Sequence, residues 1–372
     1  MNKIEFVKQI VRLLLALLLL AGCGPAPPEP TATPTPTPAY TPTPVPPGRI
    51  AFFWSVGGAI LGLERPHSGG CIRIMNADGT NESECLTRRS AYNPSWSPDG
   101  KRIAFAMQRF VDEAEAPYVY GIYTINADGT GETQLVGDSD KFLWSPDWSP
   151  DGEKIAFIAY RYKGGHLGGG VIMVMNADGS ELKVVHDDRS LSACSLAWSP
   201  DGEKIAFSAD PPGSQHDGIY VMNPDGTGVE LLATASIDCS YPGFGWNQPA
   251  WSPDGKRIAF AAWVAPDYFH EQIYVMNADG TEVTQLTHFP EFPDHYDRSP
   301  TFPEAGYYPE FPESFGVGSP TWSPDGNYIA FCECTRIYPG KRIWIIRPDG
   351  SGLTAIRKRN PNNRYCDPSW SH

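Results

Sequence analysis

Basic residues, and charge in general, are scarce in this chain. Only 19% of its 372 residues are charged, and 29 lysines and arginines stand against 43 aspartates and glutamates, so the formal net charge is −14. An acidic chain is repelled by phosphate backbones and by anionic lipid headgroups, which argues against nucleic acid as a partner. Glycine and proline are frequent instead, with 37 residues of each. Residues that turn or break the backbone at this frequency argue against a mostly helical fold.

The N-terminal segment also lacks an apolar run long enough to cross a bilayer. The run Leu13–Leu20 has eight residues, whereas a membrane-spanning helix needs about 20. Because three basic residues precede the run, residues 1–22 are predicted to be a signal peptide. The string Leu-Ala-Gly-Cys that ends at Cys23 resembles a bacterial lipobox. This resemblance implies a covalent diacylglyceryl lipid on Cys23, which would bind the protein to a membrane. An ordinary secretory signal peptide is the alternative.

Proline dominates the segment that follows. Residues 25–47 contain eleven prolines in 23 positions. Proline fixes φ and has no N–H donor, so this segment forms neither helix nor sheet, and an extended polyproline helix would make it a stalk of roughly 70 Å. We therefore divide the chain into a signal peptide (1–22), a lipidated cysteine with a stalk (23–47) and a folded domain (48–372). A flexible spacer without a length requirement is the alternative for residues 23–47.

From residue 48 onward the sequence repeats. The string Trp-Ser-Pro-Asp-Gly occurs five times, each copy followed two residues later by Ile-Ala-Phe, and strings similar to Met-Asn-Ala-Asp-Gly-Thr occur six times. Both are turn signals, because proline presets φ, aspartate bonds its own backbone and glycine accepts positive φ. Each unit therefore predicts four antiparallel strands, A to D, in which the first string makes the A–B turn and the second the C–D turn.

The apolar residues of strand B predict how the units are arranged. Ile-Ala-Phe places apolar side chains on both faces of its sheet, so each sheet must pack between two others, as the blades of a β-propeller do. Residues 367–371 match strand A, whereas residues 48–52 match strand B. We therefore predict an all-β, six-bladed β-propeller of four-stranded antiparallel blades, closed by a C-terminal strand A that joins the N-terminal strands B–D.

These repeats resemble those of TolB-type propellers, relatives of WD-repeat propellers that occur in bacterial envelope proteins. The resemblance covers residues 48–372 and implies a binding or scaffold module of the cell envelope with a protein or glycan partner. Related repeats cover prolyl-oligopeptidase-type hydrolases, whose catalytic domain carries a Gly-x-Ser-x-Gly elbow. This sequence contains no such string. We expect a monomeric, lipid-anchored extracytoplasmic propeller that is not an enzyme.

The two faces of the predicted ring differ in sequence. The near-identical A–B and C–D turns share one face, here called the turn face, and the B–C and D–A loops, which differ in length, share the other, the variable face. Histidines gather in the variable loops and suit transition metals. The metal candidates are His67, His166, His216 and His270. Similar repeats in propeller lyases of pectin fragments give the alternative function, a metal-dependent lyase or hydrolase acting on saccharides or lactones at the channel mouth. The opposing interpretation is that invariant turns and apolar strands leave histidine nowhere else. We predict no cofactor apart from the lipid.

One connection, residues 288–318, is much longer than the rest and holds eight aromatic residues. Loops of this length are usually functional, and exposed aromatic rings stack on sugars or anchor protein partners. A lid that packs on the propeller is the alternative. The repeated tryptophans are assigned to packing between blades. The binding candidates are therefore the aromatics of the insert and three tryptophans outside the repeat positions: Phe292, Tyr296, Tyr307, Tyr308, Phe311, Trp144, Trp246 and Trp263.

Eight cysteines suit an oxidising, extracytoplasmic compartment. Cys71 and Cys85 are symmetric about the C–D turn at Asp78, so they are predicted to face each other across this hairpin in a disulfide. Cys194 and Cys239 lie in successive D–A loops and are a second candidate pair.

Overall fold

Every regular element in the described part of the chain is a β-strand, as the turn-rich composition predicts. The computed structural model describes residues 48–56, 70–87, 89–110, 118–138, 140–163, 166–188, 191–209, 218–235, 248–263, 271–289, 316–334, 342–356 and 363–371. The predicted signal peptide and stalk lie outside these ranges, so the division of the chain before residue 48 stays a prediction. Over the described residues, the structure contains no helix with the length and apolar character needed to cross a membrane.

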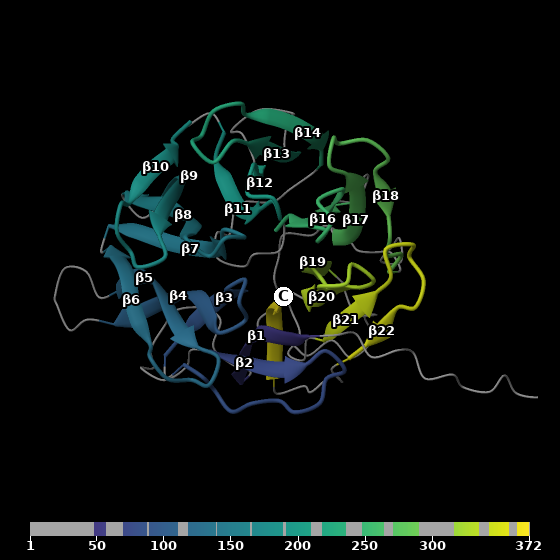
Figure 1. Ribbon diagram of the computed structural model, residues 1–372, viewed down its shortest axis with the longest axis horizontal. Coiled ribbons are helices and arrows are strands. Elements are labelled where there is room, and N and C mark those ends of the chain that lie inside the picture. The colour runs from purple at the N-terminus through teal and green to yellow at the C-terminus, as the bar shows by residue number, and fades with distance from the viewer. Residues whose placement is uncertain are drawn as a thin grey trace, which may run out of the picture. The chain divides into compact units, whose positions relative to one another are not determined.

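The strands form six antiparallel sheets around a common centre, the blades of a propeller (Figure 1). Blades are numbered here in chain order, and the strand nearest the centre is given first. Blade 1 is β23 (Asn363–Trp370), β1 (Arg49–Val56) and β2 (Cys71–Asn76). Blade 2 is β3 (Ala91–Trp96), β4 (Arg102–Phe110), β5 (Tyr118–Asn126) and β6 (Thr133–Asp138). Blade 3 is β7 (Lys141–Trp148), β8 (Lys154–Lys163), β9 (His166–Asn176) and β10 (Lys183–His186).

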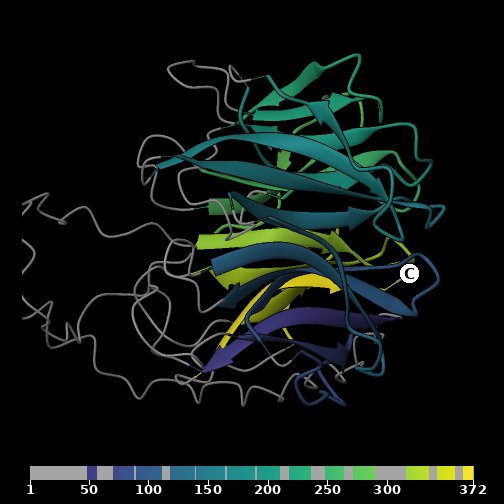
Figure 2. The ribbon, with the colours of Figure 1, turned by 90° about the vertical axis from the view of Figure 1, so that its left-hand side faces the viewer.

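The second half of the ring repeats the same order. Blade 4 is β11 (Ala193–Trp198), β12 (Ile205–Ala209), β13 (Gly218–Met222) and β14 (Glu230–Thr234). Blade 5 is β15 (Ala250–Trp251), β16 (Arg257–Trp263), β17 (Glu271–Asn277) and β18 (Thr284–Gln285). Blade 6 is β19 (Gly316–Trp322), β20 (Ile329–Cys334), β21 (Ile343–Ile346) and β22 (Thr354–Ala355). Seen from the side, the strands run from one face of the ring to the other (Figure 2).

Blade 1 closes the ring with strands from both ends of the folded domain. β23 pairs antiparallel with β1, and Ile50 lies opposite Trp370 in this ladder. The place of the fourth strand is taken by residues 83–86, where the N–H groups of Ser83 and Leu86 donate to carbonyl oxygens of β2 at 2.7 and 2.9 Å. The predicted six-bladed, four-stranded propeller closed by a C-terminal strand A is therefore confirmed.

The core lies between neighbouring blades. The phenylalanine of each Ile-Ala-Phe string, and the matching residue of β1, are among the largest fully buried side chains: Phe52, Phe105, Phe157, Phe207, Phe260 and Phe331. Each stands on strand B, the second strand from the centre, where sheets cover both faces. Complete burial of one phenylalanine side chain contributes about 2 kcal/mol through the hydrophobic effect, so six equivalent positions bind the blades together.

Side-chain hydrogen bonds of serine and aspartate stabilise the A–B turns. In blade 2 the Ser97 hydroxyl donates to Asp99 Oδ1 at 2.6 Å and accepts the N–H of Arg102 at 2.9 Å. The same bonds recur in blade 3, where Ser149 donates to Asp151. Because these hydrogen bonds favour the charged carboxylate, they hold the pKa of Asp99 and Asp151 below the ordinary value.

The C–D turns need glycine for two physical reasons. Gly226 has a φ of +87°, a conformation that other residues rarely adopt. In addition, a Cβ on Gly226 would lie 1.7 Å from the carbonyl oxygen of Val185, on the outer edge of the preceding blade. The Asp-Gly string therefore serves the turn and the close approach of two blades at once.

A disulfide links Cys71, the first residue of β2, to Cys85, with a Cα–Cα distance of 5.6 Å. These are the two cysteines that the sequence analysis placed opposite each other. The bond ties residues 83–86, which form no regular strand, to the sheet of blade 1. Cys194 is also disulfide-bonded. Cys239 lies outside the described residues, so its pairing with Cys194 stays a prediction.

We expect the double substitution Cys71→Ala/Cys85→Ala to lower the free energy of unfolding by about 3 kcal/mol, because the bond closes a loop with a sequence separation of 14 residues. The shift of the urea unfolding midpoint measures this effect. Substitution is preferable to a reductant, which would also open the disulfide of Cys194. A midpoint equal to that of the unsubstituted protein would contradict the expectation.

Candidate functional site

Most of the site residues predicted from sequence lie outside the described residues. They are Cys23, His67, His216, Cys239, Trp246, His270, Phe292, Tyr296, Tyr307, Tyr308 and Phe311. For two others only the backbone is described: His166 is the first residue of β9 and Trp263 the last residue of β16, so both stand at strand ends on the variable face. The roles assigned to all these residues stay predictions.

The described histidine with the best-defined surroundings, His186, belongs to the core. Its side chain is buried, its ring lies 5.4 Å from that of Phe207, and its Nε2 atom lies 3.4 Å from the Leu191 carbonyl oxygen. Within the ranges given above, no three histidine, cysteine, aspartate or glutamate side chains gather in a way that would hold a metal ion. The lyase alternative therefore depends on histidines whose side chains are not described: His67, His166, His216 and His270.

The structure places Trp144, a predicted ligand contact, in the packing between blades. Only 4% of this residue is exposed. Its ring centroid lies 5.0 Å from that of Tyr92 in blade 2 and 4.9 Å from that of Phe142 in its own blade. Trp144 was a candidate because it stands outside the repeat. The neighbouring rings bury it, so it offers little surface to a ligand.

Trp144 belongs to a larger group of rings that was not predicted from sequence, here called the aromatic layer: Phe53, Tyr92, Tyr120, Phe142, Trp144 and Tyr160. The contacts run from blade to blade, with centroid distances of 5.0 Å from Phe53 to Tyr92 and 4.3 Å from Tyr120 to Phe142. All six stand near the strand ends that lead into the variable loops. Four of them, Phe53, Tyr92, Tyr120 and Phe142, are only half-buried. The sequence does contain a signal for this layer, because aromatic residues recur at these strand ends in three successive units.

The innermost strands carry a second repeated feature, a polar residue before proline at positive φ. Asn93, Ser145, Ser319 and Asp367 have φ values between +46° and +51° and are buried. At each of these places the innermost strand changes register against its neighbour, as in a β-bulge. Positive φ is costly for residues other than glycine, so its recurrence in four blades marks a constraint of the architecture.

Polar side chains of the innermost strands join neighbouring blades. Ser319 donates to Asp367 Oδ1 at 3.0 Å across blades 6 and 1. Asp147 of blade 3 accepts one hydrogen bond from the Ser95 hydroxyl of blade 2 and another from the backbone N–H of Trp198 in blade 4, both 2.8 Å long. Burial raises the pKa of Asp147 to about 6, although these two donors partly offset the effect. Asp147 thus links three blades, and its raised pKa makes this link sensitive to pH.

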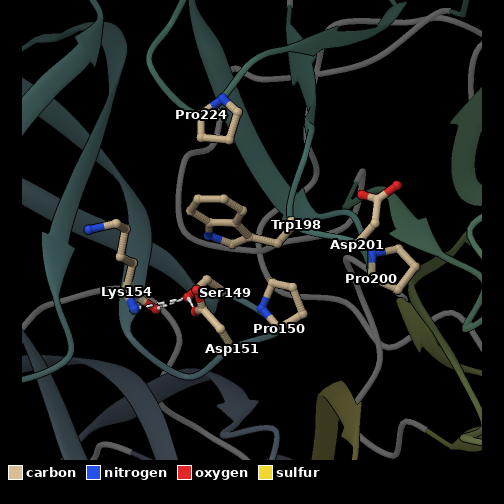
Figure 3. Close-up of a pocket in the computed structure, with 9 residues that line it drawn as sticks. Ser149, Pro150, Asp151, Lys154, Trp198, Pro200, Asp201 and Pro224 are labelled. Atoms are coloured by element: carbon tan, nitrogen blue, oxygen red, sulfur yellow. Dashed lines mark hydrogen bonds between the residues drawn. The ribbon is translucent and has the colours of Figure 1, made fainter.

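A pocket of about 440 Å³ opens on the turn face between blades 3 and 4 (Figure 3). Trp198 lies in the middle of the lining residues, and 8% of this residue is exposed. The remaining lining comes from the A–B turns of the two blades and from one C–D turn: Ser149, Pro150, Asp151, Lys154, Pro200, Asp201, Gly202 and Pro224. The sequence analysis treated this face as structural and named none of these residues as a site.

A ring of six blades, five of them with a Trp-Ser-Pro-Asp-Gly turn, defines a class of propeller, and comparison with known proteins identifies the family. The model of the TolB beta propeller domain matches residues 63–243 and 107–306, which together exceed half of the chain. The chain therefore belongs to the TolB beta-propeller domain family.

Individual relatives match shorter stretches. The Tol-Pal system protein TolB of Alcanivorax borkumensis is 33% identical over 91 residues, which are 24% of this chain and 19% of that protein. Dipeptidyl-peptidase 5 of Porphyromonas gingivalis is 31% identical over 96 residues, 24% of this chain and 14% of that protein. The chain thus matches less than a fifth of the length of either relative.

Solved structures show the same fold. TolB from Acinetobacter baumannii superimposes with a TM-score of 0.60 at 20% identity and covers 87% of this chain and 66% of that one. Kuenenia stuttgartiensis hydrazine synthase gives the same TM-score at 16% identity, over 87% of this chain and 46% of that one. At these identities the likeness concerns the fold alone.

Asp147 makes a testable prediction about pH. Its pKa of about 6 in the folded protein exceeds the ordinary value of 3.8, so between pH 4 and pH 6 the folded state holds a proton that the unfolded chain releases. The contribution of Asp147 to the free energy of unfolding therefore falls as the pH rises through this window, by at most about 3 kcal/mol. We expect urea unfolding of Asp147→Asn to lack this decline.

Asp99→Asn is the matched control. The pKa of Asp99 is lowered in the folded protein. Its contribution to the free energy of unfolding is therefore present when the pH is above the ordinary pKa, and it is lost only as the pH falls below that pKa. This variant should keep the decline between pH 4 and pH 6. Parallel pH profiles for the unsubstituted protein and Asp147→Asn would contradict the assignment.

Proposed function

We propose that this chain is an extracytoplasmic binding module that holds a partner protein on the variable face of its propeller. The aromatic layer is the observation that carries the proposal. Half-buried aromatic rings combine a large apolar area with little conformational freedom, and such rings dominate the binding energy of protein interfaces. All six rings of the layer stand on strands of the blades.

The family relation supports this function. One relative is described as a Tol-Pal system protein, which is a component of a system of several proteins. A glycan is the other ligand class that stacks on aromatic rings, and it is an outcome of the test below. The lyase alternative has no support among the described residues.

We further propose that the lipid on Cys23 and the segment 23–47 hold the propeller at a membrane surface. Cys23→Ala removes the acceptor thiol, so we expect the variant to move from the membrane fraction to the soluble fraction. Immunoblotting of the two fractions measures this change. Substitution of the neighbouring Gly24 by serine is the control and should leave the protein in the membrane fraction.

Crosslinking and affinity capture from native envelopes, with the full-length chain as bait, test the binding face. Tyr120→Ala removes a half-buried ring of the aromatic layer that contacts Phe142 at 4.3 Å. We expect it to reduce capture of the partner at least about tenfold, the effect of losing a residue important for binding.

Tyr274→Ala is the matched control. Tyr274 is also a half-buried tyrosine of a third strand, its ring packs on Phe260 at 5.6 Å and its hydroxyl donates to Gln285, much as Tyr120 pairs with Gln108, but it lies outside the aromatic layer. Equal capture by both variants would contradict a role for the layer. Loss of capture only after replacement of residues 289–317 by a glycine-serine linker would assign recognition to the insert. Capture of polysaccharide in place of protein would change the ligand class.

A further inference from the structure

The residue that precedes Ile-Ala-Phe faces a tryptophan of the next blade. In three blades this residue is an arginine whose guanidinium lies over the indole: Arg49 over Trp96, Arg102 over Trp148 and Arg257 over Trp322. The distance from the guanidinium carbon to the ring centroid is 4.7 Å in all three pairs. This identical geometry shows that the indole face at this position in the ring accommodates a stacked guanidinium.

Blades 3 and 4 have lysine at the same position. The Nζ atom of Lys154 lies 3.3 Å from Asn176 Oδ1, and that of Lys204 lies 2.8 Å from Asn223 Oδ1, so both amines turn to the C–D turn of their own blade. Neither forms a cation–π contact like those of the three arginines. No guanidinium of the described residues stacks on Trp198, and both Trp198 and Lys154 line the pocket of Figure 3.

The A–B turns of blades 3 and 4, which have lysine in place of arginine, also differ in net charge from those of blades 2 and 5. The A–B turns of blades 2 and 5 end in Asp-Gly-Lys-Arg, whereas those of blades 3 and 4 end in Asp-Gly-Glu-Lys. The substitution of Glu153 and Glu203 for lysine turns a net positive turn into a net negative one. Asp151 and Asp201 line the pocket and are held as carboxylates by serine hydroxyls. The opening is therefore anionic and suits a cation.

We propose that the Trp198 pocket binds the guanidinium of an arginine side chain presented by a partner protein. The incoming group takes the place that Arg49, Arg102 and Arg257 occupy in the other blades. Its planar face stacks on the indole, and its N–H groups donate to the carboxylates at the opening. An ammonium is less suitable. Lys154 and Lys204 both stand where an arginine would stack on an indole, but their amines bind asparagine side chains instead. This site is on the turn face and is separate from the aromatic layer of the variable face.

The test uses the peptide acetyl-Gly-Arg-Gly-amide and the full-length protein labelled with 5-fluorotryptophan. The ¹⁹F resonance of residue 198 is assigned with Trp198→Phe. We expect the peptide to shift this resonance with an affinity in the millimolar range that weakens with salt. The citrulline peptide, which has nearly the same shape but no charge, should bind at least about tenfold more weakly.

Two substitutions of lysine by arginine decide between this site and nonspecific binding. Lys154→Arg should place the chain's own guanidinium over Trp198, as in blade 2, and abolish the shift without loss of folding. Lys204→Arg makes the same chemical change in the next blade and should leave the titration unchanged. The proposal is overturned by any of three outcomes: no shift at peptide concentrations of about 20 mM, an equal shift with citrulline, or an unchanged titration of Lys154→Arg. Tyr120→Ala should titrate like the unsubstituted protein, so a failure of the variable-face proposal does not affect this result.

Discussion

A sheet that is apolar on both faces must be covered on both faces, and in this chain each blade is covered by its two neighbours. The buried phenylalanine of the second strand in every blade shows how strictly this requirement is met. It excludes an open array, because the end blades would each expose an apolar face to water. A closed ring follows, and with it the pairing of β1 with β23 and the crowding of polar residues on the innermost strands.

Because of this constraint, the sequence can vary to a different extent on the two faces of the ring. On the turn face the chain must reverse within a few residues, and glycines such as Gly226 also approach the backbone of the preceding blade. Variation is therefore limited to side chains that do not disturb the turn, such as the exchange of arginine for lysine before strand B. On the variable face the half-buried rings of the aromatic layer are held by the strands.

The sequence predicted the blades well because each strand and turn is encoded locally. Ser-Pro-Asp-Gly and Asn-Ala-Asp-Gly contain the groups that make their own hydrogen bonds, so their structure needs no information from elsewhere in the chain. Trp144 was misjudged because the ring that covers it, Tyr92, is contributed by a different unit of the repeat. The pocket at Trp198 was missed for the same reason. The exchange of arginine for lysine is visible in the sequence, but its partner indole becomes evident only when two blades are placed side by side.

The joining of β1 and β23 in one sheet has a consequence for the order of events in biogenesis. The N–H of Arg49 donates to the hydroxyl of Ser371, which is 322 positions away. Contacts between such distant residues form late, because the whole intervening chain must first become compact. In a protein that emerges from a ribosome or a translocation channel with its N-terminus first, β1 and β2 wait for their central partner until the last strand has emerged. Until β23 has emerged, blade 1 has an open sheet edge to which other chains can pair. The edge closes only when the chain has been delivered to its last strand.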